Sequence, residues 1–268
     1  MFPEENVEQC VLRGKINNIK NLSQLLKCIH FKEIAAVFAS ANGMKFVVED
    51  SKCLQAAAFI GEDIFEEYQI KDELVSFRLE LKLLMECLNI MDGAASLNLY
   101  YKEEGSPLRL VLVEDDVITD CSIKTMDALE TLHFSLPSDE VSAKMIVDGP
   151  GFKDVMCDLD ADSEFVDLLL SPHKPGLIIT TRSTAGKCEI TLPKEADMIE
   201  EFIVNEISES RYKYAQIKPA LKTLQVAAKV SLQTGKDGLL CVQFIVKTES
   251  NQMAYIEYFC TPVLPEDD

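Results

Sequence analysis

The sequence predicts an α+β fold made of two similar domains in tandem. Its 268 residues suffice for two domains that each bury a core. Segments with strand period alternate with segments of helix period. The order of these segments occurs twice, at an offset of roughly 130–135 residues, so that Leu97 corresponds to Val230 and Leu108 to Leu239. We therefore predict a domain over residues 1–124, a connector over residues 125–138 and a domain over residues 139–268.

The first half begins with a strand at residues 11–16 and an amphipathic helix near residues 18–29. Asn42-Gly43 is a pair typical of tight hairpin turns, and it joins predicted strands at residues 35–39 and 44–49. The later elements of this half are, in order, strands at 57–60, 66–70 and 74–79, a helix at 80–91, and a meander of strands at 95–101, 108–113 and 117–123.

The second half repeats this order after a connector with strand-like apolar spacing that ends in Pro137-Ser138. We expect the connector to be extended. The predicted elements that follow are a strand at 142–147, a helix at 151–159, strands at 165–170, 177–181, 189–192, 200–205 and 211–215, a helix at 217–228, and strands at 230–233, 240–246 and 254–259.

Charge is unevenly distributed along the chain. The formal net charge is −19, which by itself argues against binding to nucleic acid. Residues 9–32 and 210–236, however, together hold 11 of the 26 basic side chains and none of the 45 acidic ones. The remaining residues carry a net charge of −30. Such segregation is expected of a protein that presents one surface to a polyanion and repels it elsewhere.

The two acid-free segments each contain a predicted helix with a basic stripe. The polar positions of the stripes are Lys20, Gln24 and Lys27 in the first segment, and Lys218, Lys222, Gln225 and Lys229 in the second. An ordinary solvated face is the alternative, but such faces usually mix Glu with Lys. The pattern favours a surface that contacts phosphates without reading bases. The other two predicted helices are mixed, because Lys82 is near Glu86 and Lys153 is next to Asp154.

Catalysis and metal binding receive no support from the sequence. The run of Asp158, Asp160, Asp162 and Glu164 fails the pattern of a calcium loop, and a solvated turn explains it better. The three His are far apart, and no phosphate-binding loop or nucleophile motif is present. We therefore predict no catalytic residue, no metal and no cofactor.

The cysteines and the N-terminus indicate the compartment. The nine Cys are scattered without a C-x-x-C pair, and the N-terminus is acidic, unlike a signal peptide. Both features indicate reduced thiols in the cytosol or nucleus.

Several stretches resemble one known family. They are residues 18–34 (NIKNLSQLLKCIHFKEI), 42–43, 51–60 (SKCLQAAAFI), 75–79 (VSFRL), 211–219 (RYKYAQIKP), 229–232 (KVSL) and 255–262 (YIEYFCTP). These resemble the Rad-one family, subunits of a checkpoint clamp, and the likeness runs from about residue 11 to residue 262. It implies a DNA-clamp fold, related to the proliferating cell nuclear antigen, with antiparallel sheets outside and two helices per domain lining a ring.

The resemblance also implies partners and a location. They are two other clamp subunits (Rad-nine-like and Hus-one-like), a checkpoint clamp loader, double-stranded DNA without sequence specificity, repair and signalling proteins, no membrane, and the nucleus. The implied role is a DNA tether and docking platform for the damage checkpoint, without enzymatic activity.

Three sets of site residues follow from the resemblance. The DNA-facing set is Lys20, Lys27, Lys82, Lys153, Lys218, Lys222 and Lys229. The subunit seams are the edge strands, with Val117, Ile118, Thr119, Cys121 and Ile123 in one and Cys188, Glu189, Ile190, Thr191 and Leu192 in the other. The groove for partner peptides borders the connector at Met126, Leu129, Leu132 and Phe134.

Two alternatives remain open at this stage. A metal-dependent 3′–5′ exonuclease would require carboxylates that converge in space. A homotrimeric clamp of the replication type would place Asp154 and Asp158 in the hole three times, which mildly disfavours it.

Overall fold

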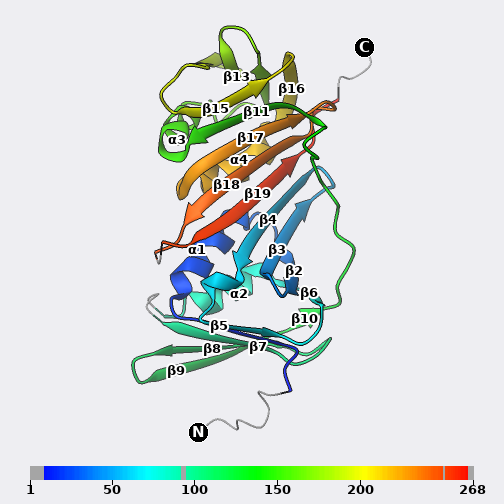
Figure 1. The fold of residues 1–268 in the computed structure, drawn as a ribbon, viewed down its shortest axis with the longest axis vertical. Helices are drawn as coiled ribbons and strands as arrows, with labels where there is room; N and C mark the ends of the chain where they lie inside the picture. Colours follow the sequence, from blue (N-terminus) through cyan, green and yellow to red (C-terminus); the bar gives the residue numbers. More distant parts are fainter. Residues whose placement is uncertain (1–8, 92–94, 250, 265–268) are drawn as a thin grey trace. The chain divides into compact units, whose positions relative to one another are not determined.

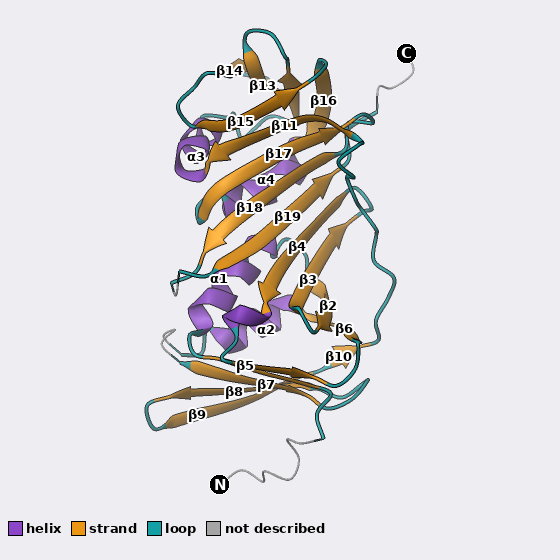
Figure 2. Cartoon of the chain, in the orientation of Figure 1, coloured by secondary structure: helices purple, strands orange, loops and turns teal. Residues whose placement is uncertain are grey.

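The computed structural model describes residues 9–91, 95–249 and 251–264, and Figure 1 shows the course of the chain. The described residues divide into two compact units. The first comprises the described parts of Met1–Glu49, Ala57–Thr131 and Thr248–Ala254, and the second those of Asp50–Ala56, Leu132–Lys247 and Tyr255–Asp268. Helices and strands are coloured separately in Figure 2. No helix in the described part of the chain is long and apolar enough to cross a membrane.

The first unit contains two antiparallel sheets and two helices. One sheet has the strand order β5-β1-β7-β8-β9, and the other includes the order β10-β6-β2-β3-β4. In chain order the elements are β1 (Leu12–Ile16), α1 (Ile19–Ile29), β2 (Ile34–Ser40), β3 (Gly43–Asp50), β4 (Leu54–Gly61), β5 (Glu67–Ile70), β6 (Leu74–Glu80), α2 (Leu81–Leu88), β7 (Ser96–Tyr101), β8 (Leu108–Glu114), β9 (Val117–Ile123) and β10 (Thr125–Met126).

Alternation of side chains explains how the first unit buries its core. Leu12, Gly14 and Ile16 of β1 are buried, whereas the intervening Arg13 and Lys15 face outward. Helix α1 buries Leu22, Leu25 and Leu26 among other residues. Helix α2 contacts both sheets, because it touches β9 of one and β2 and β6 of the other. The core therefore lies between the sheets and the helices.

The predicted hairpin at Asn42-Gly43 is confirmed, since β2 pairs antiparallel with β3. Gly43 has φ of 120°, which side chains rarely adopt. A Cβ there would also lie 2.2 Å from the carbonyl oxygen of Ile60. Only glycine fits this turn.

The second unit repeats the arrangement. One sheet has the order β14-β13-β12-β16, and the other includes the order β19-β18-β17-β11-β15. In chain order the elements are β11 (Val141–Asp148), α3 (Gly149–Cys157), β12 (Phe165–Leu170), β13 (Gly176–Ser183), β14 (Gly186–Pro193), β15 (Ile199–Val204), β16 (Ser208–Lys213), α4 (Tyr214–Thr223), β17 (Ala227–Gly235), β18 (Leu240–Lys247) and β19 (Met253–Cys260).

Both helices of the second unit pack on one apolar core. A cavity of about 40 Å³ has only apolar surface, and its lining includes Phe152 and Met156 of α3, Leu221 of α4, and Leu168 and Phe244 from the two sheets. Asp148 caps the N-terminus of helix α3, because its side chain accepts a hydrogen bond from the Gly151 N–H at 2.8 Å. The predicted α+β class, with two similar sheet-and-helix units in tandem, is confirmed.

The largest difference from the predicted elements is in α4. The helix spans Tyr214–Thr223 rather than residues 217–228. After Thr223 the chain tightens into i→i+3 turns, with the N–H of Gln225 bonded to the carbonyl of Lys222. Strand β17 then begins at Ala227, where it pairs with Val246 of β18. The ladder with β18 thus overrides the helical period of residues 224–228.

Candidate nucleic-acid interface

Helix α1 presents Lys20 and Lys27 to solvent from the first unit. Both line a hollow of about 430 Å³ beside Ser23 of α1 and Leu88 and Asn89 of the α2 end. Asn18 caps the helix by accepting a hydrogen bond from the Lys20 N–H at 2.9 Å. The structure therefore brings the two predicted lysines together on one hollowed surface.

Glu249 moderates the charge of this surface. Its Oε1 lies 3.9 Å from the Nζ of Lys20, and its Oε2 accepts a hydrogen bond from the Asn18 Nδ2 at 2.7 Å. Its backbone N–H is bonded to the Asn21 side chain at 3.1 Å. Lys27 has no ion pair with any residue that the structure describes. Sequence reasoning missed Glu249, because it lies more than 200 residues away in the chain and only folding places it beside α1.

Helix α4 presents Lys218 and Lys222 from the second unit, and both are exposed. They are four residues apart, so they are neighbours on one helical face. Within residues 9–91, 95–249 and 251–264, neither forms an ion pair. The helix is held from beneath by Tyr258, whose hydroxyl lies 3.3 Å from the Thr223 hydroxyl and 3.4 Å from the carbonyl of Pro219.

The assignment of Lys229 to the stripe of α4 is wrong. Lys229 lies in β17, and its Nζ is 2.6 Å from the Oε2 of Glu200 on β15. The helix ends at Thr223, six residues earlier, because residues 227–235 pair with β11 and β18 instead. A lysine paired in this way offers less charge to a phosphate than Lys218 or Lys222 does.

The remaining two lysines sit among acids, as the sequence indicated. The Nζ of Lys82 lies 3.8 Å from the Oε1 of Glu86, one turn further along α2. Lys153 on α3 is half-buried and adjoins the exposed Asp154. The basic groups least compensated by described neighbours are therefore Lys27, Lys218 and Lys222, with Lys20 partly compensated.

The two strands expected at the subunit seams each lie at the end of a sheet. Strand β9 ends the five-stranded sheet of the first unit, and β14 ends the four-stranded sheet of the second. Val117 and Ile118 on β9 are 61% and 51% exposed, a high value for apolar side chains. Ile123 and Leu192 are buried at 1% and 6%, so their side chains pack into the core rather than toward a neighbouring chain.

The predicted groove residues are distributed over the connector. In the first unit, Met126 pairs with Arg78 through β10, and Leu129 is 59% exposed. In the second unit, Phe134 stacks on Phe259 with ring centroids 5.9 Å apart, and the carbonyl of Leu132 accepts a hydrogen bond from the Gln55 side chain. Phe134 is thus committed to packing, whereas Leu129 remains open to solvent.

The acidic run after α3 forms a turn. Asp160 accepts a hydrogen bond from the Asp162 N–H at 3.0 Å. The Ser183 hydroxyl, first, and this N–H hold the pKa of the Asp160 carboxyl below its ordinary value. In the described part of the chain, no group of three or more His, Cys, Asp or Glu side chains is placed to hold a metal ion. The convergence of carboxylates that an exonuclease requires is not found among these residues, and this alternative is not favoured.

Comparisons with known proteins agree with the fold. Residues 11–246 match the family model described as repair protein Rad1/Rec1/Rad17. The chain is 37% identical to the cell cycle checkpoint protein RAD1 of Mus musculus, over 97% of this chain and 95% of the mouse protein. It is 37% identical to the human protein of the same name, over 97% of this chain and 94% of that protein. The DNA repair protein Rad1 of Drosophila melanogaster is 30% identical over 96% of both chains. The chain belongs to the Rad1/Rec1/Rad17 family of repair proteins.

Proposed function

We propose that this chain is one subunit of a heterotrimeric sliding clamp that encircles double-stranded DNA and serves as a platform in the DNA-damage checkpoint and in repair. The observation that carries the proposal is the likeness to checkpoint and repair proteins over almost the whole chain, on an α+β fold with two similar units. The proposed role needs no catalysis, and the nucleus is the compartment in which it would act.

The proposed contact with DNA is electrostatic and independent of sequence. Lys27, Lys218 and Lys222 are exposed lysines on helices, without ion pairs to described residues, and can release counterions from phosphates. A clamp that slides must not read bases. Lysine suits this role, because its ammonium group is a point charge and lacks the planar fork with which arginine makes bidentate hydrogen bonds. Lys20, Lys82, Lys153 and Lys229 belong to the same proposed set, but each has an acidic neighbour that weakens it.

The proposed assembly uses main-chain pairing at β9 and β14 with two different clamp subunits, Rad-nine-like and Hus-one-like. An unpaired edge strand offers a row of N–H and C=O groups to another chain. A checkpoint clamp loader would then place the ring on DNA, and repair and signalling proteins would dock near Met126, Leu129, Leu132 and Phe134.

The test of DNA contact replaces Lys27, Lys218 and Lys222 with Gln in the assembled complex. The matched control replaces Lys52, Lys124 and Lys247, which are exposed lysines outside the proposed DNA-facing set. We expect the first triple variant to be retained less on circular duplex DNA. The slope of log affinity against log salt, which is negative, should become shallower by about 3, because three phosphate contacts are removed.

Equal retention of both triple variants would show that these lysines are only solvated. The mass of the complex isolated from cells tests the assembly separately. One copy of this chain with two different clamp-like chains is the expected composition, whereas three copies of this chain would favour the homotrimer.

A further inference from the structure

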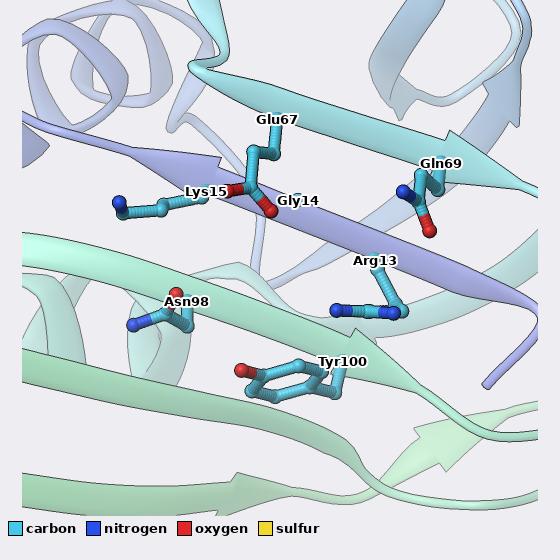
Figure 3. A pocket seen from close by; sticks show the side chains of 7 residues that line it. All are labelled: Arg13, Gly14, Lys15, Glu67, Gln69, Asn98 and Tyr100. Atoms are coloured by element: carbon cyan, nitrogen blue, oxygen red, sulfur yellow. The ribbon is translucent and has the colours of Figure 1, made fainter. Parts of the chain in front are cut away.

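A row of side chains crosses the outward face of the five-stranded sheet in the first unit. In register, Arg13 of β1 lies opposite Gln69 of β5 and Tyr100 of β7, and Tyr100 in turn lies opposite Arg109 of β8. An aromatic ring is thus flanked by two arginines on adjacent strands. Figure 3 shows Arg13, Asn98 and Tyr100 projecting from neighbouring strands on this face.

Only some of the cations on this face are neutralised. The Nζ of Lys15 lies 2.5 Å from the Oε2 of Glu66, and Arg109 forms a two-bonded pair with Asp120. Arg13 and Lys102 have no ion pair with any residue in the described ranges. In a chain of net charge −19, two cations that no described residue neutralises, beside a partly exposed aromatic ring, require an explanation.

Tyr100 lines two hollows on this face. The smaller, of about 20 Å³, is bounded by Arg13, Lys15, Asn98 and other residues of the row, and Figure 3 shows its lining. It is large enough for one small group only. The larger, of about 240 Å³, also has Lys102 and Arg109 in its lining. A ligand that contacts both hollows must therefore lie along the face of the sheet.

The spacing of the two cations matches that of an extended peptide. Lys102 follows the last residue of β7, its carbonyl accepts a hydrogen bond from the Val11 N–H, and it lines the larger hollow with Tyr100. If the strand register continues by one residue, Lys102 is a diagonal neighbour of Arg13, at roughly 7–8 Å. Side chains two residues apart in an extended peptide lie on one side at roughly 6.5–7 Å. Two carboxylates in an acidic-x-acidic segment can therefore reach both cations while the peptide crosses Tyr100.

We propose that the outward face of β1, β7 and β8 binds an extended acidic peptide of a partner protein, with Arg13 and Lys102 as the carboxylate-binding residues and Tyr100 as the platform. Amide and hydroxyl groups at Gln69, Asn98 and Tyr100 supply further hydrogen-bonding partners along the row.

Fixed acids on the same face favour a peptide over nucleic acid. Glu67 lies opposite Lys15, and Asp120 lies opposite Val111 in the next row. A duplex carries one charge per ~1.7 Å and would bring phosphates against these carboxylates. A peptide with a few spaced acids avoids them.

The test measures fluorescence anisotropy of a labelled peptide, Gly-Asp-Leu-Asp-Leu-Asp-Gly, with the assembled complex. The variant Arg13→Gln with Lys102→Gln removes the two charges but keeps polar side chains of similar length. The matched control, Lys218→Gln with Lys222→Gln, removes two charges from α4. We expect the first variant to bind the peptide about tenfold more weakly and the control to bind it like the wild type. Thermal unfolding checks that both variants remain folded.

Two further measurements, a charge-reversal variant and competition by duplex DNA, test the proposal. A complex with Arg13→Glu and Lys102→Glu should prefer the same peptide with Lys in place of Asp. Unchanged affinity in the Arg13 and Lys102 variant, or equal binding of a peptide with Asn in place of Asp, would overturn the proposal. Displacement of the peptide by duplex DNA from the α4 variant would overturn it in favour of nucleic acid. Loss of duplex retention in the α4 variant reports on the proposed clamp function alone, so the two proposals fail separately.

Discussion

Bidentate arginine–carboxylate pairs connect neighbouring strands in both units. In the first unit, the Arg109 Nε lies 2.9 Å from the Asp120 Oδ1, and the Nη2 lies 2.5 Å from the Oδ2. In the second, Arg211 makes the equivalent pair with Asp167 at 2.6 and 3.2 Å. The hydrogen bonds from Arg109 are the main reason why the pKa of Asp120 is held below its ordinary value.

At the residue scale, the Arg109–Asp120 pair predicts a pH effect. Because the folded pKa of Asp120 is lowered, the pair contributes stability above the unfolded pKa of about 3.9, and loses it as pH falls through the folded pKa. Both side chains are 37% exposed, so screening limits the contribution to below about 1 kcal/mol. In Arg109→Gln, an NMR titration of the Asp120 carboxyl carbon should show a pKa nearer to the ordinary value. Lys124→Gln is the control, and an unchanged titration in Arg109→Gln would contradict the assignment.

Strands β9 and β14, each at one end of its sheet, are the elements on which the proposed assembly would depend. Strand β8 pairs with β9 along its whole length, and β13 does the same with β14. Each of these end strands therefore has one side without a partner strand among the residues that the structure describes. Backbone pairing needs no particular side chain. The exposed apolar residues on β9 are the more specific signal.

At the element scale, Ile118→Asp should weaken assembly without unfolding the chain. Ile118 is 51% exposed in this chain, so the free energy of unfolding should change by less than about 0.5 kcal/mol. At a seam the new carboxylate would be buried without a partner, so assembly should weaken by at least about tenfold. The control is Ile203→Asp on β15, which is 48% exposed and lies outside the predicted seams. Sedimentation of the complex is the measurement, and equal effects of both changes would exclude β9 as a seam.

At the scale of the whole molecule, charge and open edges act together. Most of the chain is strongly acidic, whereas residues 9–32 and 210–236 contain no acid. Such a distribution of charge would direct a polyanion to the basic segments. The unpaired sheet edges would leave an isolated subunit prone to association.

The thermal stability of the chain should therefore depend on its partners. A protein that binds its partners only when folded gains stability as their concentration rises above the dissociation constant. We expect the Tm of this chain to rise with the concentration of the two other clamp subunits, and to stay constant with serum albumin at equal mass. A Tm independent of the clamp subunits would contradict a heterotrimer.

The sequence by itself determined the order of the elements, their repetition and the segregation of charge. These features depend on local periodicity and on single residues such as Gly43, whose backbone geometry admits no side chain. The basic faces of α1 and α4 were visible because charged residues on one helical face need no distant partner to be recognised.

Only the tertiary structure decided which of those charges remain uncompensated. The pairing of β17 with β18 ended α4 at Thr223 and placed Lys229 beside Glu200. Folding also brought Glu249 to Lys20, across more than 200 residues, and aligned Arg13 with Tyr100 across two strands. Such pairs depend on strand register, and register is set by contacts distant in the chain that no local pattern contains.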